Sequence, residues 1–594
     1  MVGLLARGRT DGPHYKWVAL SNTTLGMLMA TINSSIILIS LPGIFRGIGI
    51  DPLSPGNVGY LLWLMMGYML VTAVLVVSLG RLGDIMGRVR IYNAGFAVFS
   101  VASIILALDP MKGGGGALWL VLWRLLQGIG GAMLFANSSA IIVDAFPPEQ
   151  RGLAMGINQV AAIAGSFIGL IAGGLLSVVD WRLVFWVSVP VGVVGTIWGY
   201  HSLRDNGRRV AARIDWWGNV TFGLGLTAVL AAIVYGIQPY GAHTMGWTAP
   251  KVLVGLIGGV ALLAVFVVIE MRVKAPMFNL RLFKIRQFAT GSAAGLLAAI
   301  ARGGMQFMLI IWLQGIWLPL HGYKYEDTPL WAGIYLLPLT IGFLLAGPLS
   351  GYLSDRHGAR LLSTGGLIVF AGSFLGLLFV PTDFSYWVFA LLVFFNGVGG
   401  GLFSAPNSTA IMNAVPAQER GGAAGLQATF MNSGMVLSIG IFFSLMIVGL
   451  ANTLPASMSH GLLANGVSAD KAQSVASLPP VGSLFASFLG YNPLQSLLGT
   501  QSTAGVTSGQ WHTLTGKEFF PHLISSPFHH GLVIVFAMAI AMSLLAAVFS
   551  VLRGRRFVHD DEPGHPHPAR EHATEAAFVS GSLPGELALE DDRV

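Results

Sequence analysis

Five polar or charged side chains interrupt long apolar runs of this sequence, and their types define the chemistry available there. They are Asn33 and Ser34 in "INSSIILISLP", Arg124 and Gln127 in "WRLLQGIGGA", and Arg302 in "AAIARGGMQF". Amides, hydroxyls and guanidinium groups bind polar ligands and counter-ions. The sequence has no nucleophile elbow, metal-ligand cluster or phosphate-binding loop beside them. The pattern therefore predicts a binding or transport protein that is not an enzyme and that needs no cofactor and no metal.

The composition places these side chains in a membrane. Of the 594 residues, 54% are hydrophobic and 10% are charged, whereas an average soluble domain has about 25% charged residues. Repeated windows of 18 or more apolar residues are long enough to cross a hydrocarbon core of about 30 Å. The net charge of +7 is not gathered in an aromatic-rich basic patch, so no nucleic-acid partner is expected. The chain has no cysteine, which excludes disulfides and thiolate chemistry.

The apolar runs predict an all-α membrane protein with fourteen transmembrane helices. Most of the 33 Lys and Arg residues fall on one side of these spans, so the positive-inside rule predicts a multi-pass protein of the plasma membrane with both termini cytoplasmic. The predicted spans are 17–43, 57–79, 91–109, 117–142, 153–178, 183–203, 216–237, 250–271, 289–315, 330–352, 362–380, 386–411, 424–449 and 530–552.

These spans divide the chain into five regions. A cytoplasmic N-terminus (1–16) precedes a six-helix bundle (17–203), two inserted helices with cytoplasmic flanks (204–288), a second six-helix bundle (289–552) and a cytoplasmic, disordered tail (553–594). The second bundle includes an outer loop, 451–529. Its apolar pieces favour a partly ordered cap with short helices, and a tolerated surface insertion is the alternative.

An internal repeat relates the two bundles. "RLLQGIGGAMLFANSSA" matches "FFNGVGGGLFSAPNSTA", which pairs Gly128 with Gly397 and includes Asn137 and Asn407. "GRLGDIMGR" matches "GYLSDRHGAR", which pairs Asp84 with Asp355. The offset covers eight helices, an even number, so the two copies are parallel repeats about an axis along the membrane normal. Such repeats predict a substrate path between two bundles, with the polar residues above, Asn137 and Asn407 near it.

These stretches carry a family resemblance. "GRLGDIMGRVR" resembles the signature loop of the major facilitator superfamily, and "GYLSDRHGAR" resembles its second copy. "DWRLVFWVSVPVG" and "IDWWGN" are similar to stretches of its fourteen-helix drug:proton antiporter branch. The resemblance implies the major facilitator fold and a cytoplasmic gate that breaks as the bundles rock. The gate residues that it implies are Gly80, Gly83, Asp84, Gly87, Arg88, Arg90, Asp355, Arg356, Gly358 and Arg360.

The sequence departs from this branch at two positions. The branch typically carries its proton-binding acid a few residues before the proline of the first helix, and counting back from Pro42 places Asn33 there. An amide does not titrate, so proton coupling is left open, and Asn33 is expected to face the cleft. Leu170 replaces the proline of the fifth-helix pattern GPxxGG, which removes a bend signal.

Arg124 and Arg302 have no acidic partner deep in a span, which favours an amphipathic substrate whose polar group is anionic or accepts hydrogen bonds. The first hypothesis is a secondary exporter of drug-like small molecules, acting as a monomer among membrane lipids. The alternatives are an exporter of lipid-like metabolites and a non-transporting receptor or scaffold.

Overall fold

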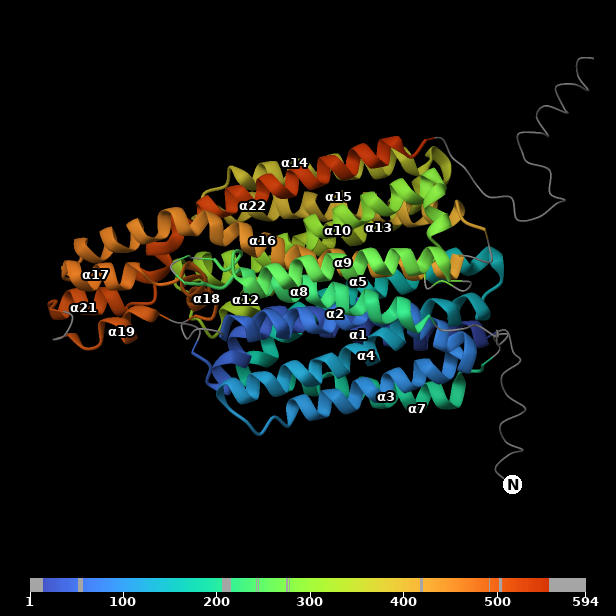
Figure 1. Cartoon of the computed structure of the whole chain (residues 1–594), viewed down its shortest axis with the longest axis horizontal. Helices are drawn as coiled ribbons and strands as arrows, with labels where there is room; N and C mark the ends of the chain where they lie inside the picture. Colours follow the sequence, from blue (N-terminus) through green and yellow to red (C-terminus); the bar gives the residue numbers. More distant parts are fainter. Residues whose placement is uncertain are drawn as a thin grey trace, which may run out of the picture.

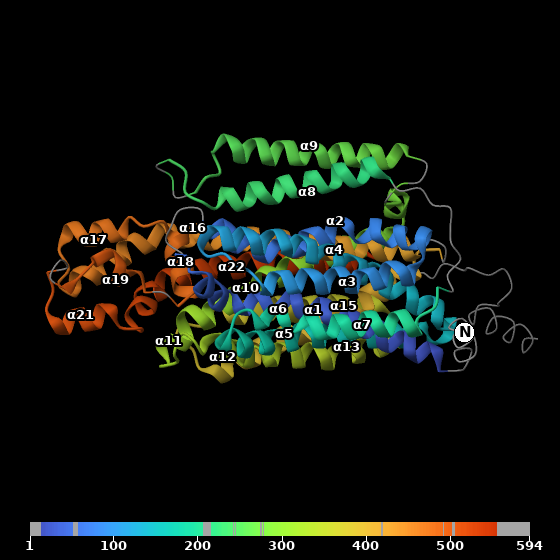
Figure 2. The ribbon, with the colours of Figure 1, turned by 90° about the horizontal axis from the view of Figure 1, so that it is seen from below.

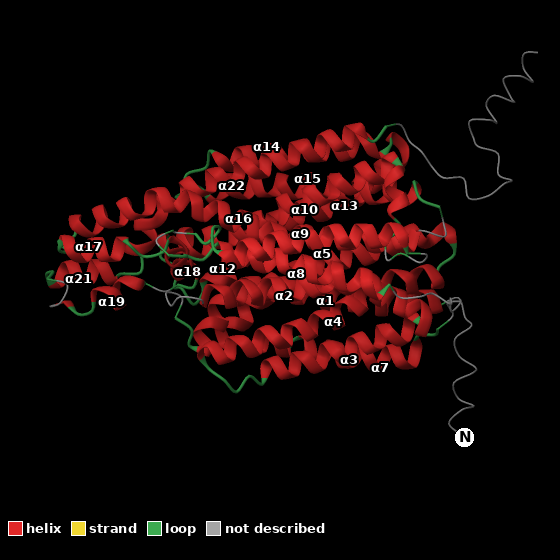
Figure 3. Cartoon of the chain, in the orientation of Figure 1, coloured by secondary structure: helices red, strands yellow, loops and turns green. Residues whose placement is uncertain are grey.

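The structure is a computed structural model that describes residues 14–51, 57–205, 215–241, 243, 245–273, 276, 278–416, 420–490, 492–501 and 505–554. Within these ranges, the side chains of 148, 149, 151–153, 355–357, 420, 421 and 496 are not described. The described chain is helical almost throughout (Figure 3), and fourteen of its helices are long and apolar enough to cross a membrane. The predicted number of spans is confirmed.

The N-terminal bundle holds the first six spans. Its helices are α1 (Tyr15–Ile48), α2 (Asn57–Met86), α3 (Arg88–Ala107), α4 (Gly113–Ala145) and α5 (Pro148–Val179), followed by the short α6 (Leu183–Trp186) and α7 (Ser188–Ser202), which together make the sixth span. Glycines at every fourth position of α5 face α1. A Cβ at Gly165 would lie 2.9 Å from the Leu28 carbonyl oxygen, and one at Gly173 would lie 2.7 Å from that of Ile36. Small residues at this spacing let two membrane helices approach closely.

The C-terminal bundle repeats this arrangement. It begins with η1 (Leu280–Lys284) and α10 (Arg286–Trp312), which continues through the π-turn η2 (Leu313–Trp317) into α11 (Leu318–Leu320). The other elements are α12 (Thr328–Tyr335), α13 (Leu337–His357), α14 (Ala359–Leu378), α15 (Tyr386–Asn413), α16 (Arg420–Ala464) and α22 (Phe519–Leu552). Gly128 of α4 packs against the α2 backbone at Tyr68, and its repeat partner Gly397 of α15 packs against the α13 backbone at Leu339.

The two inserted helices, α8 (Trp216–Gly236) and α9 (Pro250–Arg272), form a hairpin along one edge of the molecule (Figure 2). α8 contacts α2 of the first bundle and α16 of the second. α9 packs on α8 and leaves Val254 and Ile257 largely exposed, as a lipid-facing helix does. The bundles themselves meet where α2 contacts α16 and where α5 contacts α12 and α13.

The last two spans are longer than predicted. α16 runs to Ala464 and α22 begins at Phe519, so both helices continue past the apolar core, where the sequence analysis ends them at 449 and starts them at 530. Hydropathy marks where lipid contact ends and not where helical hydrogen bonding ends, which explains the error. The helices α17 (Ala469–Ala476), α18 (Pro480–Phe488), α19 (Pro493–Leu498) and α21 (Ser508–Thr515) lie between them.

These helices and the projecting ends of α16 and α22 form a cap that extends beyond one end of the bundles (Figure 1). We call this end the cap side. The opposite end carries the turn between α2 and α3, the start of α1 and the end of α22, and we call it the terminal side.

Candidate functional site

Arg124 lies at the centre of a buried polar network in the N-terminal bundle. Its side chain is 1% exposed. Nη1 donates hydrogen bonds to Asn33 Oδ1 on α1 and to Gln127 Oε1 at 2.7 Å, and the guanidinium lies 4.7 Å from the centre of the Tyr68 ring on α2. In the described part of the chain its partners are thus two amides and an aromatic ring rather than a carboxylate. This network stabilises a charge that costs about 3 kcal/mol near mid-bilayer.

The structure gives Asn33 of α1 partners on two neighbouring helices. Its side chain is fully buried, and its Nδ2 lies 3.5 Å from Ser188 Oγ of α7. Its Oδ1 accepts a hydrogen bond from Arg124 of α4. The physical reason is that a buried guanidinium needs an acceptor, and the Asn33 amide oxygen supplies one. Ser34 is half-buried and donates to the carbonyl oxygen of Ala30 in its own helix, 3.4 Å away.

Amide–serine pairs link neighbouring helices at equivalent positions of the two repeats. Gln127 Nε2 donates to Ser103 Oγ at 2.7 Å, and the repeat counterpart Asn396 donates to Ser373 Oγ at the same distance. Both pairs are buried and join the third helix of a repeat to its fourth. The same fold is therefore held by the same hydrogen bond in both halves.

A second type of pair joins the fourth helix to the fifth. Asn158 Nδ2 donates to Ser138 Oγ at 3.3 Å, and Gln427 Nε2, its repeat counterpart, donates to Ser408 Oγ at 2.7 Å. Asn137, beside Ser138, points elsewhere. Its Nδ2 donates to the carbonyl oxygen of Met133 at 2.9 Å, and its side chain packs against α2.

A pocket lies in the C-terminal bundle around Arg302. Arg302 of α10 is partly exposed, and its guanidinium lies 5.1 Å from the centre of the Phe343 ring. The lining combines apolar and hydrogen-bonding groups, and no Asp or Glu is among its described residues. The lining residues are Gly295, Ala298, Ala299, Arg302, Leu367, Phe370, Gly399, Gly400, Phe403, Ser404, Asn407, Ser408, Gln427, Met431 and Met435. The sequence-predicted residues Arg302 and Asn407 meet here, whereas Asn33, Ser34, Arg124, Gln127 and Asn137 do not line this pocket.

Asn407 is held from the terminal side of the pocket by a second arginine. Its Nδ2 donates to the Gly291 carbonyl oxygen at 3.2 Å, and its Oδ1 accepts from Nη2 of Arg553, which follows α22. Arg553 is 3% exposed, and its Nε and Nη1 have no protein acceptor among the described residues. Two guanidinium groups therefore act on this part of the bundle, one in the pocket lining and one behind Asn407.

The turn between α2 and α3 carries an ion-pair network. Arg88 Nε donates to Asp84 Oδ1 at 2.9 Å, and Arg88 Nη1 contacts both carboxylate oxygens of Asp144, at the end of α4, at 2.7 and 2.8 Å. All three residues belong to the N-terminal bundle. In this conformation the network therefore ties α2 and α3 to α4 and does not bridge the two bundles.

Glycines of this turn are required sterically. A Cβ at Gly83 would overlap the Asn137 amide oxygen, and one at Gly87 would overlap the Asp205 carboxylate. Gly87 has a φ of 112° and its repeat counterpart Gly358 has a φ of 82°, a region that favours glycine. Gly80 differs, because its Cβ would make only an ordinary contact, 3.6 Å from Ala136.

The remaining predicted gate residues are less constrained. Arg90 and Arg360 are exposed at the terminal side. The side chains of Asp355 and Arg356 lie outside the described residues.

The two bundles are in contact at the cap side. Gln314 Nε2 of η2 lies 3.4 Å from the Ile39 carbonyl oxygen of α1, and Arg46 lies 3.9 Å from Glu326 across the same seam. α5 contacts α12 nearby, where a Cβ at Gly174 would lie 2.5 Å from the Leu330 Cα. The two bundles therefore pack directly against each other at this end.

Sequence reasoning missed several residues of these networks, namely Tyr68, Ser103, Ser138, Asn158, Gln427 and Arg553. The repeat offset could have found some of them, because it pairs Gln127 with Asn396 and Asn158 with Gln427. Arg553 carried no such signal, since it looks like one of several basic residues that end a membrane helix. Polar residues that face one another across helices in a pair of parallel repeats are suited to ligand binding and conformational switching. Among the described residues, no group of His, Asp or Glu could hold a metal ion.

Comparisons with known proteins agree with this architecture. Residues 23–439 match the model of the Major Facilitator Superfamily. The multidrug resistance protein Stp of Mycobacterium tuberculosis is 30% identical, over 74% of this chain and 77% of Stp. The tetracenomycin C resistance and export protein of Streptomyces glaucescens is 27% identical over 79% of this chain and 84% of that protein, and the riboflavin transporter RibZ of Clostridioides difficile is 26% identical over 72% and 88%.

Solved structures share the fold. An inward-facing bacterial homologue of the human lysosomal transporter Spinster superimposes with a TM-score of 0.53 at 16% identity, covering 92% of this chain and 98% of that one. On the family match and these relatives, the chain is a multi-pass membrane transporter of small molecules that belongs to the Major Facilitator Superfamily.

Proposed function

We propose that the protein is a secondary exporter of amphipathic, drug-like small molecules in the plasma membrane. The resistance and export functions in the names of its relatives support the direction and the substrate class. The bias of Lys and Arg toward the terminal side supports a cytoplasmic location for both termini and an outer location for the cap. Each chain contains both bundles, so a monomer surrounded by lipid is sufficient for alternating access.

The proposed substrate class rests on the pocket around Arg302. A partly exposed guanidinium without an acidic group in the lining attracts a carboxylate, sulfonate or phosphate. Phe370, Phe403, Met431 and Met435 provide an apolar surface beside it. This combination fits an amphipathic molecule whose polar end is anionic or accepts hydrogen bonds.

The size of the pocket indicates how it is used. The space open to water is about 50 Å³, which holds a few water molecules, whereas drug-sized ligands occupy sites of about 300–1,000 Å³. In this conformation the pocket can hold only a polar group of a substrate. We therefore assign it as a head-group subsite that joins a larger cavity when the bundles rock.

Residue 33 does not carry a coupling proton in this proposal. Asn33 has no titratable group, and its amide oxygen is used by Arg124. If protons drive export, the carboxylate that binds them lies elsewhere. Asn33→Asp introduces a carboxylate beside Arg124, and a pH-driven flux that appears only in this variant would identify the position as a latent coupling site.

The test is transport in liposomes containing the purified protein, with and without an imposed pH gradient. Carboxyfluorescein serves as the anionic probe and ethidium as the cationic one, and Arg302→Gln is compared with the matched surface variant Arg272→Gln at the exposed end of α9. A hydrogen bond to a charged group contributes about 1.5–3 kcal/mol, which corresponds to roughly a 10- to 100-fold loss of anion transport efficiency in Arg302→Gln. Arg272→Gln should retain transport. A strong preference for ethidium that Arg302→Gln leaves unchanged would contradict the anionic substrate class.

A further inference from the structure

The cap contains one helix that is buried on every side. All nine residues of α18, with the sequence "PVGSLFASF", are buried. The neighbouring α17 and α21 each have exposed residues, as surface helices do. A helix that is apolar and buried all round is a core element. α18 is therefore not a surface decoration of the cap.

Several contacts join α18 to the C-terminal bundle. Ser487 Oγ donates to the Gly315 carbonyl oxygen of the π-turn η2 at 2.6 Å. Phe485 stacks on Phe443 of α16 with ring centres 4.9 Å apart, and Phe488 meets Phe307 of α10 edge-on at 6.0 Å. Since a hydrogen bond and aromatic pairs have preferred geometries, these contacts fix the orientation of α18 on this bundle.

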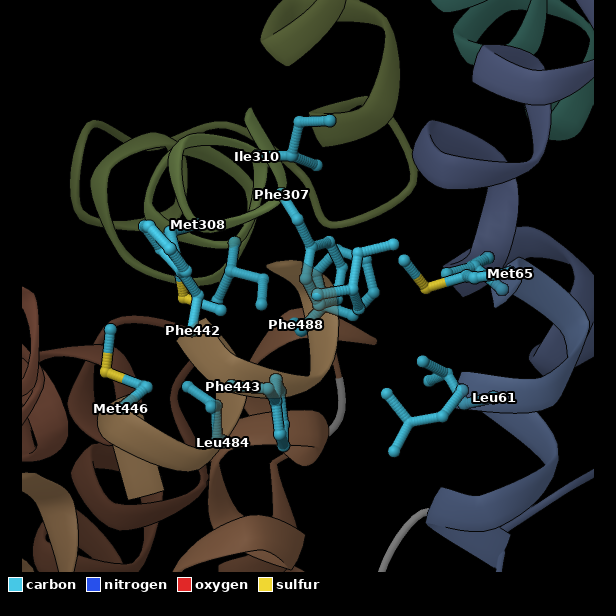
Figure 4. Packing of buried hydrophobic residues seen from close by; sticks show 14 of the residues in the cluster. Leu61, Met65, Phe307, Met308, Ile310, Phe442, Phe443, Met446, Leu484 and Phe488 are labelled. Atoms are coloured by element: carbon cyan, nitrogen blue, oxygen red, sulfur yellow. The ribbon is translucent and has the colours of Figure 1, made fainter. Parts of the chain in front are cut away.

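The contact of α18 with the N-terminal bundle is made by apolar side chains. α18 also touches α2, and Figure 4 shows Leu61 and Met65 of α2 on the side of the cluster toward Phe443 and Phe488, with Phe443 lying between Leu61 and Leu484. These residues belong to one buried apolar cluster. Apolar surfaces can separate without leaving an unpaired hydrogen-bonding group, so this side of α18 is the one that can part most readily.

The π-turn η2 positions the hydrogen bond between Ser487 of α18 and the Gly315 carbonyl oxygen. In η2 the chain widens for one turn between α10 and α11, at residues 313–317. A Cβ at Gly315 would lie 3.1 Å from Ser487 Oγ, so glycine allows α18 to reach the carbonyl oxygen. π-turns inside helices are frequent at functional sites. Gln314 of the same turn reaches toward α1, so η2 contacts both α18 and the N-terminal bundle.

We propose that α18 is the gate at the cap-side mouth of the transport path. It moves as a fixed part of the C-terminal bundle and seals against α2 through Leu61 and Met65. The path opens toward the cap when this apolar seam separates, and the substrate leaves between α2 and α18. The inference rests on the proposed alternating access and adds the element that closes its outer end.

The absence of native cysteine allows a direct test by disulfide cross-linking in liposomes. Met65→Cys with Phe488→Cys joins the two sides of the seam. Phe443→Cys with Phe485→Cys, whose rings stack with centres 4.9 Å apart, is the matched control, which joins α18 to its own bundle. Oxidation should lower carboxyfluorescein transport at least tenfold in the seam pair, with recovery on reduction, and should change it less than twofold in the control pair. Arrest by the control pair, or full transport by the oxidised seam pair, would overturn the gate.

A second measurement does not depend on disulfide formation. A membrane-impermeant maleimide added from the cap side should label Leu61→Cys at least tenfold faster during transport than in resting protein, in which Leu61 is buried. Ser474→Cys on the exposed face of α17 should be labelled equally in both. Equal labelling of Leu61→Cys in both conditions would overturn the gate. Failure of the cysteine-free parent to transport would instead count against the proposed function, so the two failures are distinguishable.

Discussion

The buried contact between Asn33 and Arg124 predicts a measurable coupling between α1 and α4. Asn33→Leu removes one acceptor of the Arg124 guanidinium, which keeps its bond to Gln127 at 2.7 Å and its contact with the Tyr68 ring. Water cannot hydrate the guanidinium in place of the lost acceptor, because the Arg124 side chain is 1% exposed. We expect Asn33→Leu to lower the free energy of unfolding.

The size of the effect follows from the membrane setting. Interhelical hydrogen bonds in membrane proteins contribute about 0.6 kcal/mol on average and about 1.7 kcal/mol at most, and bonds to charged groups are roughly twice as strong as neutral ones. A coupling of about 1–2 kcal/mol between residues 33 and 124 is therefore expected. Arg124→Met removes the charge that needs an acceptor, so Asn33→Leu should cost little in that background.

The assay is a double-mutant cycle by equilibrium unfolding in mixed micelles, using Asn33→Leu, Arg124→Met and the double variant. Independent sites add within about 0.3–0.5 kcal/mol. A coupling energy below that limit would refute the assignment of Asn33 as an acceptor for Arg124, and Asn33 would then again be available as a cleft residue.

Two other consequences can be checked with the same material. Gly83→Ala should lower the free energy of unfolding by about 1–3 kcal/mol, the usual cost of overpacking, because its Cβ overlaps the Asn137 side chain, and Gly80→Ala should change it by less than about 0.5 kcal/mol. Burial raises the pKa of Asp109, against the lowering effects of the Met111 amide and Arg182. The folded state therefore binds this proton more tightly than the unfolded state. Its contribution to stability is fully present below the unfolded pKa and is lost as pH rises through the folded pKa. Asp109→Asn should reduce the loss of stability in that pH range, as followed by thermal unfolding, and an unchanged pH profile would contradict the burial effect.

Most of the fold could be predicted from the sequence. Fourteen apolar runs correspond to fourteen helices, because each span must satisfy its own backbone hydrogen bonds in lipid. The repeat identified Gly87 and Gly358, whose positive φ is a local requirement for glycine. It also placed Asn137 and Asn407 at matching positions of the two bundles. These features depend on hydropathy, backbone conformation or duplication, all of which can be recognised from the sequence alone.

The direction of each polar side chain could not be predicted in this way. Asn33 occupies a position where the resembling family carries an acid, yet only the packing of α1 against α4 decides that its amide faces Arg124. Hydropathy likewise does not show whether "PVGSLFASF" lies on the cap surface or between the bundles. The sequence by itself determined the helices, their number and their pairing into two repeats. The tertiary structure decided which residues face each other, because rotation and crossing of helices depend on partners far away in the chain.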